Sequence, residues 1–170
     1  MSEIHAQLVQ MTKMLKNLDR WLGKAEEHVK AKGIDPSTVL QARLAPDMFP
    51  FTRQVQAACD GVKTLAARLS GKEPPKHPDT EQTFEQLHAR VKTVLDYVKG
   101  FGESDFDGGD ARMLPMSFMP GKGQTGADFV REMNLPNTYF HLCMAYAILR
   151  QSGVTLGKMD YLGRLTLQDL

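Results

Sequence analysis

Four stretches of the chain repeat apolar residues at alternating steps of three and four. This spacing places a continuous apolar stripe on one side of an α-helix. The first stripe runs from Ile4 to Val29, the second from Met48 to Leu69, the third from Phe84 to Phe101 and the fourth from Val130 to Ile148. Because each stripe needs a partner to bury it, the pattern predicts an all-α domain of the four-helix-bundle kind.

The residues between the first two stripes predict where those helices end and begin. Gly33 is a typical C-terminal stop, and Asp35-Pro36-Ser37 predicts a short connector or a single turn. Pro46 and Pro50 crowd the start of the second helix, where a missing N–H costs least. We expect Asp47 to cap this helix.

The third helix lies between two segments that lack a helical period. The polar, proline-rich residues 70–78 predict an exposed loop, after which Asp79 or Thr80 can cap the helix. Residues 102–126 hold six of the fourteen glycines. We expect a structured glycine-rich insertion whose apolar patch, Met113 to Met119, can pair as a short β-hairpin over the bundle.

The fourth helix carries the most informative pattern. Thr125 and Asp128 resemble a capping box at its start. Pro136 should kink the helix or restart it, since proline removes an internal hydrogen bond. Residues 139–149 are apolar on nearly every face, which predicts a central, buried element.

Composition narrows the class of protein. A chain of 170 residues with 42% hydrophobic residues can form one domain, 1–170, around one core. The 21 basic and 20 acidic residues nearly balance, so the chain has no excess positive charge that would attract nucleic acid. The sequence has no run of eighteen apolar residues, so no membrane span is predicted. The N-terminus lacks the features of a signal peptide, so we expect a cytoplasmic protein. Cys59 and Cys143 lie in apolar helical patterns and are expected to be buried thiols in a reducing compartment.

Polar residues on the apolar stripes mark the candidate chemistry. Asn137 and His141 stand four residues apart and should both point toward the middle of the bundle. Without partners, each buried group would cost about 1–3 kcal/mol. Asp47 and Gln54 fall on one row of the second helix and can face them.

Two interpretations of these four residues stay open. They can form a hydrogen-bonded core network, or Asp47, Gln54, Asn137 and His141 can hold a divalent ion such as zinc, nickel or manganese. One imidazole and two amides are weak ligands, which favours the network.

Several segments resemble a domain-of-unknown-function family within the DinB/YfiT-like superfamily, and the likeness runs nearly end to end. The segments are 44–51, 54–56, 135–141, 145–150 and 157–161. The resemblance implies an antiparallel four-helix bundle that is often dimeric. Better-studied members of the superfamily carry a three-histidine divalent metal site and include thiol-dependent transferases and DNA-damage-inducible proteins.

The sequence departs from the superfamily at the expected metal ligands. Members with metal typically bear a His-x-x-x-His pair ahead of a Leu-Arg-x-x-Gly ending. Residues 149–153 match that ending and place Asn137 and His141 at the pair, so only its second histidine is present. No histidine lies between His28 and His77, so Asp47 or Gln54 would have to replace the third ligand.

The sequence therefore leaves three functional hypotheses. The leading one is a DinB/YfiT-like bundle protein, expected to be a homodimer, with a polar central pocket that binds a small molecule or a weak divalent metal. The second is a non-catalytic structural or dimerisation module with a vestigial site. The third is a metal-assisted transferase or hydrolase.

Overall fold

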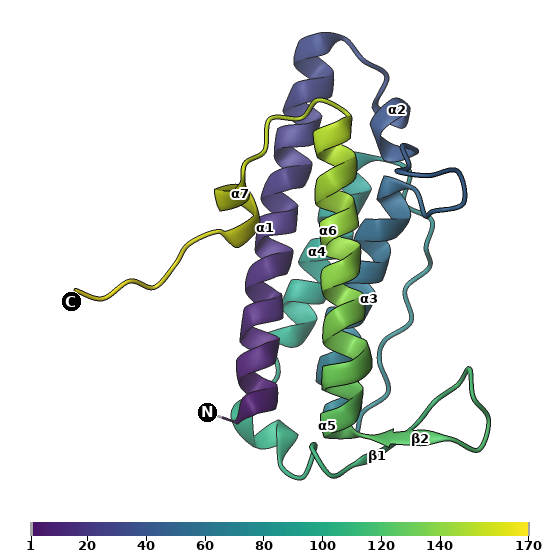
Figure 1. Cartoon of the computed structure of the whole chain (residues 1–170), viewed down its shortest axis with the longest axis vertical. Helices are drawn as coiled ribbons and strands as arrows, with labels where there is room; N and C mark the ends of the chain where they lie inside the picture. The colour runs from purple at the N-terminus through teal and green to yellow at the C-terminus, as the bar shows by residue number, and fades with distance from the viewer. Residues whose placement is uncertain (1, 170) are drawn as a thin grey trace.

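Four long helices lie side by side along the long axis of the molecule (Figure 1). In the computed structural model, which describes residues 2–169, they are α1 (Glu3–Lys32), α3 (Phe51–Leu69), α4 (Phe84–Val98) and α6 (Leu135–Gln151). The mostly helical fold expected from the four apolar stripes is confirmed. The shorter elements are α2 (Pro36–Leu40), the 3₁₀ helix η1 (Glu103–Phe106), β1 (Met113–Pro115), β2 (Gly123–Thr125), α5 (Gly126–Asp128), the π-helix η2 (Phe129–Asn134) and α7 (Lys158–Leu162).

The long helices do not simply alternate in direction. α1 runs opposite to α4, and α3 runs opposite to α6, but α3 and α4 point the same way (Figure 1). The cause is the segment between α3 and α4, residues 70–83, which returns along α3 before α4 begins. Its path is marked by a contact of His77 with Lys63 and by a hydrogen bond between Glu81 and Gln56.

The apolar stripes supply the core, and α1 shows this most clearly. All eight apolar positions predicted for this helix are buried: Ile4, Leu8, Met11, Leu15, Leu18, Leu22, Ala25 and Val29. Burial of each larger side chain contributes about 1.5–3 kcal/mol. The end of α1 is also as predicted, because Gly33 adopts the left-handed conformation with φ of 61°.

Two predicted caps are wrong. Pro50 occupies the N-cap position of α3 in an extended conformation, and Asp47 lies exposed in the loop before it. Thr83 caps α4 by accepting a hydrogen bond from the Gln86 N–H, instead of Asp79 or Thr80. Asp79 is engaged elsewhere, in ion pairs with Arg53 and Arg90.

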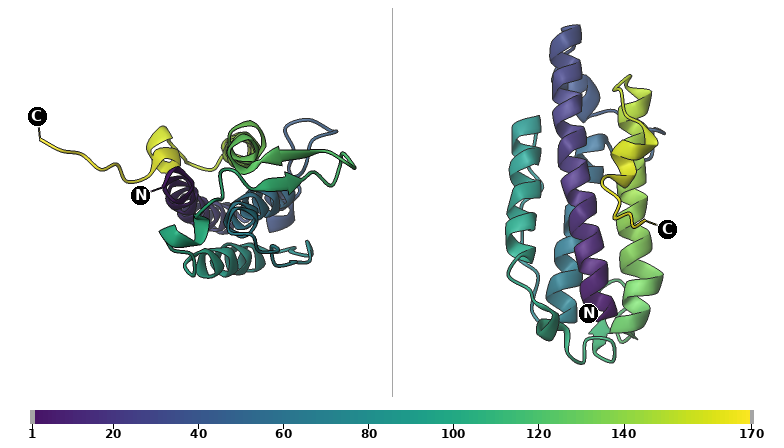
Figure 2. Two further views of the ribbon diagram at one scale, coloured as in Figure 1. Left: turned by 90° about the horizontal axis from the view of Figure 1, so that it is seen from below. Right: turned by 90° about the vertical axis from the view of Figure 1, so that its left-hand side faces the viewer.

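Residues 102–126 contain a small two-stranded sheet, but its second strand lies beyond the patch Met113 to Met119 that was expected to form a hairpin over the bundle. β1 and β2 pair antiparallel, with Met113 opposite Thr125. The hairpin lies at one end of the long helices and projects sideways from them (Figure 2, left). Leu114 is buried against the core, whereas Phe118 and Met119 near the tip are exposed.

The last long helix, α6, begins as predicted, but its outer face is more exposed than predicted. Thr125 caps the start as expected, and the π-helical turn η2 leads directly into α6, whose first turn contains Pro136. Only the inner face of α6 is buried, so the expectation of burial on nearly every face is wrong. Phe140 and Cys143 are exposed, and Cys59 is the buried thiol of the two cysteines. In the part of the chain that the structure describes, no helix is long and apolar enough to cross a membrane.

Candidate functional site

His141 and Gln54 form a buried hydrogen-bonded pair between α6 and α3. Nδ1 of His141 lies 2.7 Å from Oε1 of Gln54, and Nε2 of Gln54 donates to the main-chain oxygen of Phe49 at 3.1 Å. Because the Phe49 oxygen can only accept, the Gln54 amide must present Oε1 to the imidazole. The Nδ1 atom of His141 therefore carries the proton, and Nε2 of the neutral ring is a free acceptor.

His141 is half-enclosed by aromatic rings, and its surroundings disfavour the charged form of the imidazole. The Phe49 ring stacks on the imidazole at 6.2 Å between centroids, and the Phe140 ring meets it edge-on at 5.3 Å. Burial lowers the pKa of His141, and the nearby Arg53 guanidinium lowers it further. Within residues 2–169, Nε2 of His141 has no hydrogen-bond partner.

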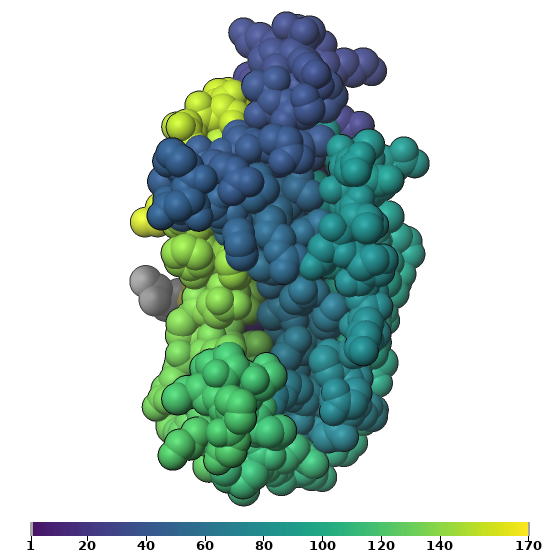
Figure 3. All heavy atoms as spheres, turned by 90° about the vertical axis from the view of Figure 1, so that its right-hand side faces the viewer, coloured from purple at the N-terminus to yellow at the C-terminus, as the bar shows by residue number. Residues whose placement is uncertain are grey.

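The imidazole lines a groove between α3 and the continuous η2–α6 segment. The groove encloses about 300 Å³ and is visible as a hollow between the light-green and blue helices in Figure 3. Its polar and charged side chains include Arg53, Asp60, Arg68, Asn134, Asn137 and His141. Such a concave surface with a few converging polar groups is typical of small-molecule sites.

A close contact between the two helices forms the wall of this groove. A Cβ atom added to Gly61 would overlap Oγ1 of Thr138 and lie 3.1 Å from Cβ of Thr138. Nδ2 of Asn134 donates to the Gly61 main-chain oxygen at 3.0 Å, and Oγ1 of Thr138 donates to the Asn134 oxygen at 2.8 Å. The π-helical turn thus ends where the helices touch. Irregular turns of this kind are frequent at functional sites.

The charged groups of the groove are held by groups outside it. Asp60 lies 2.7 Å from Nζ of the buried Lys63. Arg53 pairs with Asp79, and Arg68 donates to the Pro115 oxygen of the hairpin. These contacts therefore hold the three side chains in place.

The charged residues of the groove on α3 were not among the predicted site residues. On α3, the groove residues 53, 57, 60, 64 and 68 follow the three-four spacing and form a stripe beside the apolar one. This second stripe of small, polar and charged residues is the signal that could have revealed Asp60 and Arg68.

The four predicted metal ligands do not all meet at one point. His141 and Gln54 are bonded to each other, and Asn137 lines the same groove from an exposed position. Asp47 is exposed in the loop before α3 and does not line the groove. Gln54 contacts the ring nitrogen opposite the free one, so it orients the imidazole and does not share an ion bound at Nε2. Among residues 2–169, no three or more His, Cys, Asp or Glu side chains are grouped as metal ligands.

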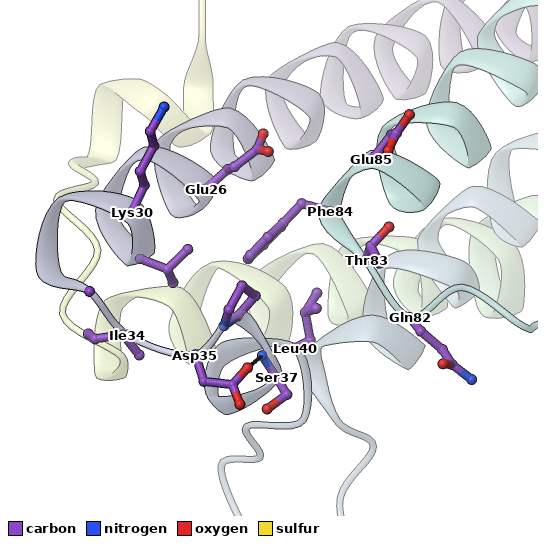
Figure 4. A pocket seen from close by; sticks show the side chains of 13 residues that line it. Glu26, Lys30, Ile34, Asp35, Ser37, Leu40, Gln82, Thr83, Phe84 and Glu85 are labelled. Atoms are coloured by element: carbon purple, nitrogen blue, oxygen red, sulfur yellow. Dashed lines mark hydrogen bonds between the residues drawn. The ribbon is translucent and has the colours of Figure 1, made fainter.

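A second hollow of about 690 Å³ lies between the end of α1, α2 and the start of α4 (Figure 4). Phe84 and Leu40 form its apolar part, while Glu26 and Glu85 stand at its edge. Its Asp35 carboxylate accepts a hydrogen bond from the Ser37 N–H and so caps α2. It has no imidazole or thiol, and we therefore take the groove of His141 as the candidate site.

Comparison with known proteins agrees with the fold. The family model described as "Domain of unknown function (DUF1993)" matches residues 4–162. The chain belongs to this family. A DinB family member protein from Shewanella denitrificans, known from a crystal structure, is 40% identical and superposes with a TM-score of 0.93, covering 99% of this chain and 100% of that chain. No curated protein matches the sequence. The predicted resemblance is thereby confirmed.

Proposed function

We propose that this protein is a four-helix bundle of the DinB/YfiT-like type that binds a small molecule in the groove between α3 and η2–α6. The observation that supports this proposal is the Nε2 atom of His141, which has no hydrogen-bond partner among the described residues and belongs to a ring that Gln54 orients. Burial lowers the pKa of this ring, which favours its neutral form. A group that donates a hydrogen bond to Nε2 would satisfy it. Arg68, which makes no ion pair among the described residues, adds positive charge along the groove and favours a ligand that also carries an acidic group.

The same nitrogen is the atom that a divalent ion would use, so a metal at His141 stays a prediction. The small molecule is the better match, since Asp60, the carboxylate of the groove, is already paired with Lys63. An ion bound at Nε2 would gain little from the remaining amide groups.

The test is a binding screen followed by ¹⁵N NMR of the histidine side chains. Small phenols and carboxylic acids, and the chlorides of zinc, nickel and manganese, are added to the untagged protein. We expect acids that bear a hydrogen-bond donor to shift the His141 signals. Their binding should weaken about tenfold in His141→Gln, which corresponds to the loss of one good hydrogen bond.

His28→Gln is the matched control, because His28 lies outside the groove, near Gly153. It should bind the same compounds as the native protein. If no compound shifts the His141 signals, or if both variants bind equally well, the proposed site is refuted. A response to the metal chlorides alone would favour the metal-assisted enzyme instead.

We also propose that two copies associate through the outer face of α6. Phe140 is 49% exposed, and Cys143 is exposed beside it on the same face. An apolar outer face on a surface helix is typical of an interface. Analytical ultracentrifugation should show a dimer that Phe140→Glu dissociates and Gln151→Glu, at the exposed end of the same helix, does not. A monomeric native protein would rule out this interface.

A further inference from the structure

A cavity on the opposite side of the molecule from the groove is lined by basic side chains. It encloses about 320 Å³ between α1 and the segment that follows α7, on the face that Figure 2, right, turns toward the viewer. Its lining residues are Lys13, Lys16, Asn17, Arg20, Arg164 and Thr166. Four of these six carry a positive charge and none is acidic, although the whole chain has a net charge of only +1.

The charges of this cavity have no carboxylate partner in the described part of the chain. Lys13, Lys16 and Arg164 make no ion pair, and Arg20 donates only to Oδ1 of Asn17 at 3.2 Å. By contrast, Nζ of Lys24 on the same helix lies 2.6 Å from Oδ1 of Asp160. The cavity therefore gathers four positive charges that no carboxylate of the described residues neutralises.

The fold holds Arg164 close to the bases of α1. Nε1 of Trp21 donates to the Asp160 oxygen at 2.9 Å, and Nδ2 of Asn17 donates to the Tyr161 oxygen at 2.9 Å. Gly163 then turns the chain with φ of 66°, and a Cβ atom there would lie 2.6 Å from Nδ2 of Asn17. Only glycine fits this approach, which places the next residue, Arg164, over α1.

Like charges gathered in one cavity repel each other, so this arrangement favours a bound anion. We propose that the cavity is a binding site for a phosphoryl group, carried by a soluble phosphorylated small molecule. Guanidinium groups bind phosphate oxygens in pairs, and ammonium groups add point charges. The Thr166 hydroxyl and four cations suit a dianion or trianion better than a single carboxylate.

Pyrophosphate is the probe for this site, and isothermal titration calorimetry at low ionic strength is the measurement. We expect saturable binding of one pyrophosphate per chain that weakens about tenfold in Arg164→Gln and in Lys16→Gln. Arg164 follows the last helix, so its replacement does not touch the core. Binding should also weaken with added sodium chloride, because salt screens exposed charges.

Lys92→Gln is the matched control, since it removes the same charge from α4, where the Lys92 side chain is 78% exposed. It should change the affinity less than twofold. An equal loss in Lys92→Gln would show attraction by net charge alone and overturn the proposal, as would the absence of saturable binding. Vesicles of phosphatidic acid, compared with phosphatidylcholine, test the other source of phosphate. If the protein binds these vesicles but does not bind pyrophosphate, the proposal of a soluble ligand is wrong.

Discussion

Gly61 determines how closely α3 and α6 approach beside the groove. Its missing side chain leaves the space that Oγ1 of Thr138 occupies, and its oxygen accepts the hydrogen bond from Asn134. A glycine inside a helix is unfavourable by about 0.5–1 kcal/mol relative to alanine. The protein accepts this cost where two helices need a direct contact.

Gly61→Ala should therefore destabilise the protein by about 1–3 kcal/mol, the usual effect of overfilling a packed site. The overlap with Thr138 outweighs the better helix propensity of alanine. Urea denaturation measures the free energy of unfolding. Titration with a compound that binds in the groove measures the change in the affinity of the groove.

Gly23→Ala is the matched control. Gly23 also lies inside a helix, α1, but an added Cβ there would meet no atom within 4 Å. We expect this change to stabilise the protein by about 0.5–1 kcal/mol. If both alanine variants were more stable than the native protein, that result would contradict the close contact between Gly61 and Thr138.

At the scale of elements, Arg90 holds the long connection between α3 and α4. Its side chain is only 3% exposed and pairs with Asp79, while its Nε lies 3.6 Å from Oε1 of Glu81. A further carboxylate, Asp60, lies 3.9 Å away on α3. One buried guanidinium thus links the connection to both helices.

Arg90→Met should destabilise the protein by about 3 kcal/mol, because removing one partner leaves the others of a buried ion pair uncompensated. The loss should be at the low end of the known range, since Asp79 can be rehydrated. Hydrogen exchange followed by mass spectrometry should show faster exchange in residues 72–82. Lys92→Met, on the exposed side of α4, should change stability by less than about 0.5 kcal/mol. Equal exchange in the two variants would contradict this role of Arg90.

Periodicity predicted the four long helices because their apolar stripes follow a single period. It did not predict the start of α3, where Pro50 and not Asp47 occupies the cap position. Nor did it predict Asp60 in the groove, since a charged residue beside an apolar stripe resembles a solvated one. The pairing of Gln54 with His141 could be predicted because both residues lie on the inward-facing sides of their helices.

The basic cavity shows why other features were beyond sequence reasoning. Arg164 lies far from Lys16 along the chain, and the two meet only because α7 docks on α1 through Trp21 and Asn17. No local pattern encodes such a contact. The same holds for the reversed path of residues 70–83, which depends on pairing with side chains of α3 and α4.

At the scale of the whole molecule, two histidines should make stability depend on pH. Burial lowers the pKa of His141, with a further contribution from Arg53. Burial also lowers the pKa of His77, and Lys63 and Arg90 add to the effect. Both residues bind a proton more weakly in the folded than in the unfolded chain, where the pKa is about 6.5.

The sign follows from this difference. Since the unfolded chain binds more protons, the free energy of unfolding rises with pH between the folded and unfolded pKa values. The contribution of the two histidines is fully present above about pH 6.5 and is lost as pH falls through their folded pKa values. Acidic side chains with lowered pKa, such as Asp96 at about 2, titrate below this window.

Urea denaturation between pH 8 and pH 5 tests the prediction. The native protein should lose stability on acidification, and His141→Gln and His77→Gln should each lose less, with the double variant losing least. The difference in slope should disappear above pH 7.5, where His77 and His141 are neutral in both the folded and the unfolded chain, and this provides the internal control. If a variant loses stability as steeply as the native protein, protonation of the replaced histidine does not destabilise the folded state. For His141, that result would also remove the reason to regard Nε2 as a free acceptor, because a charged ring donates from both nitrogens.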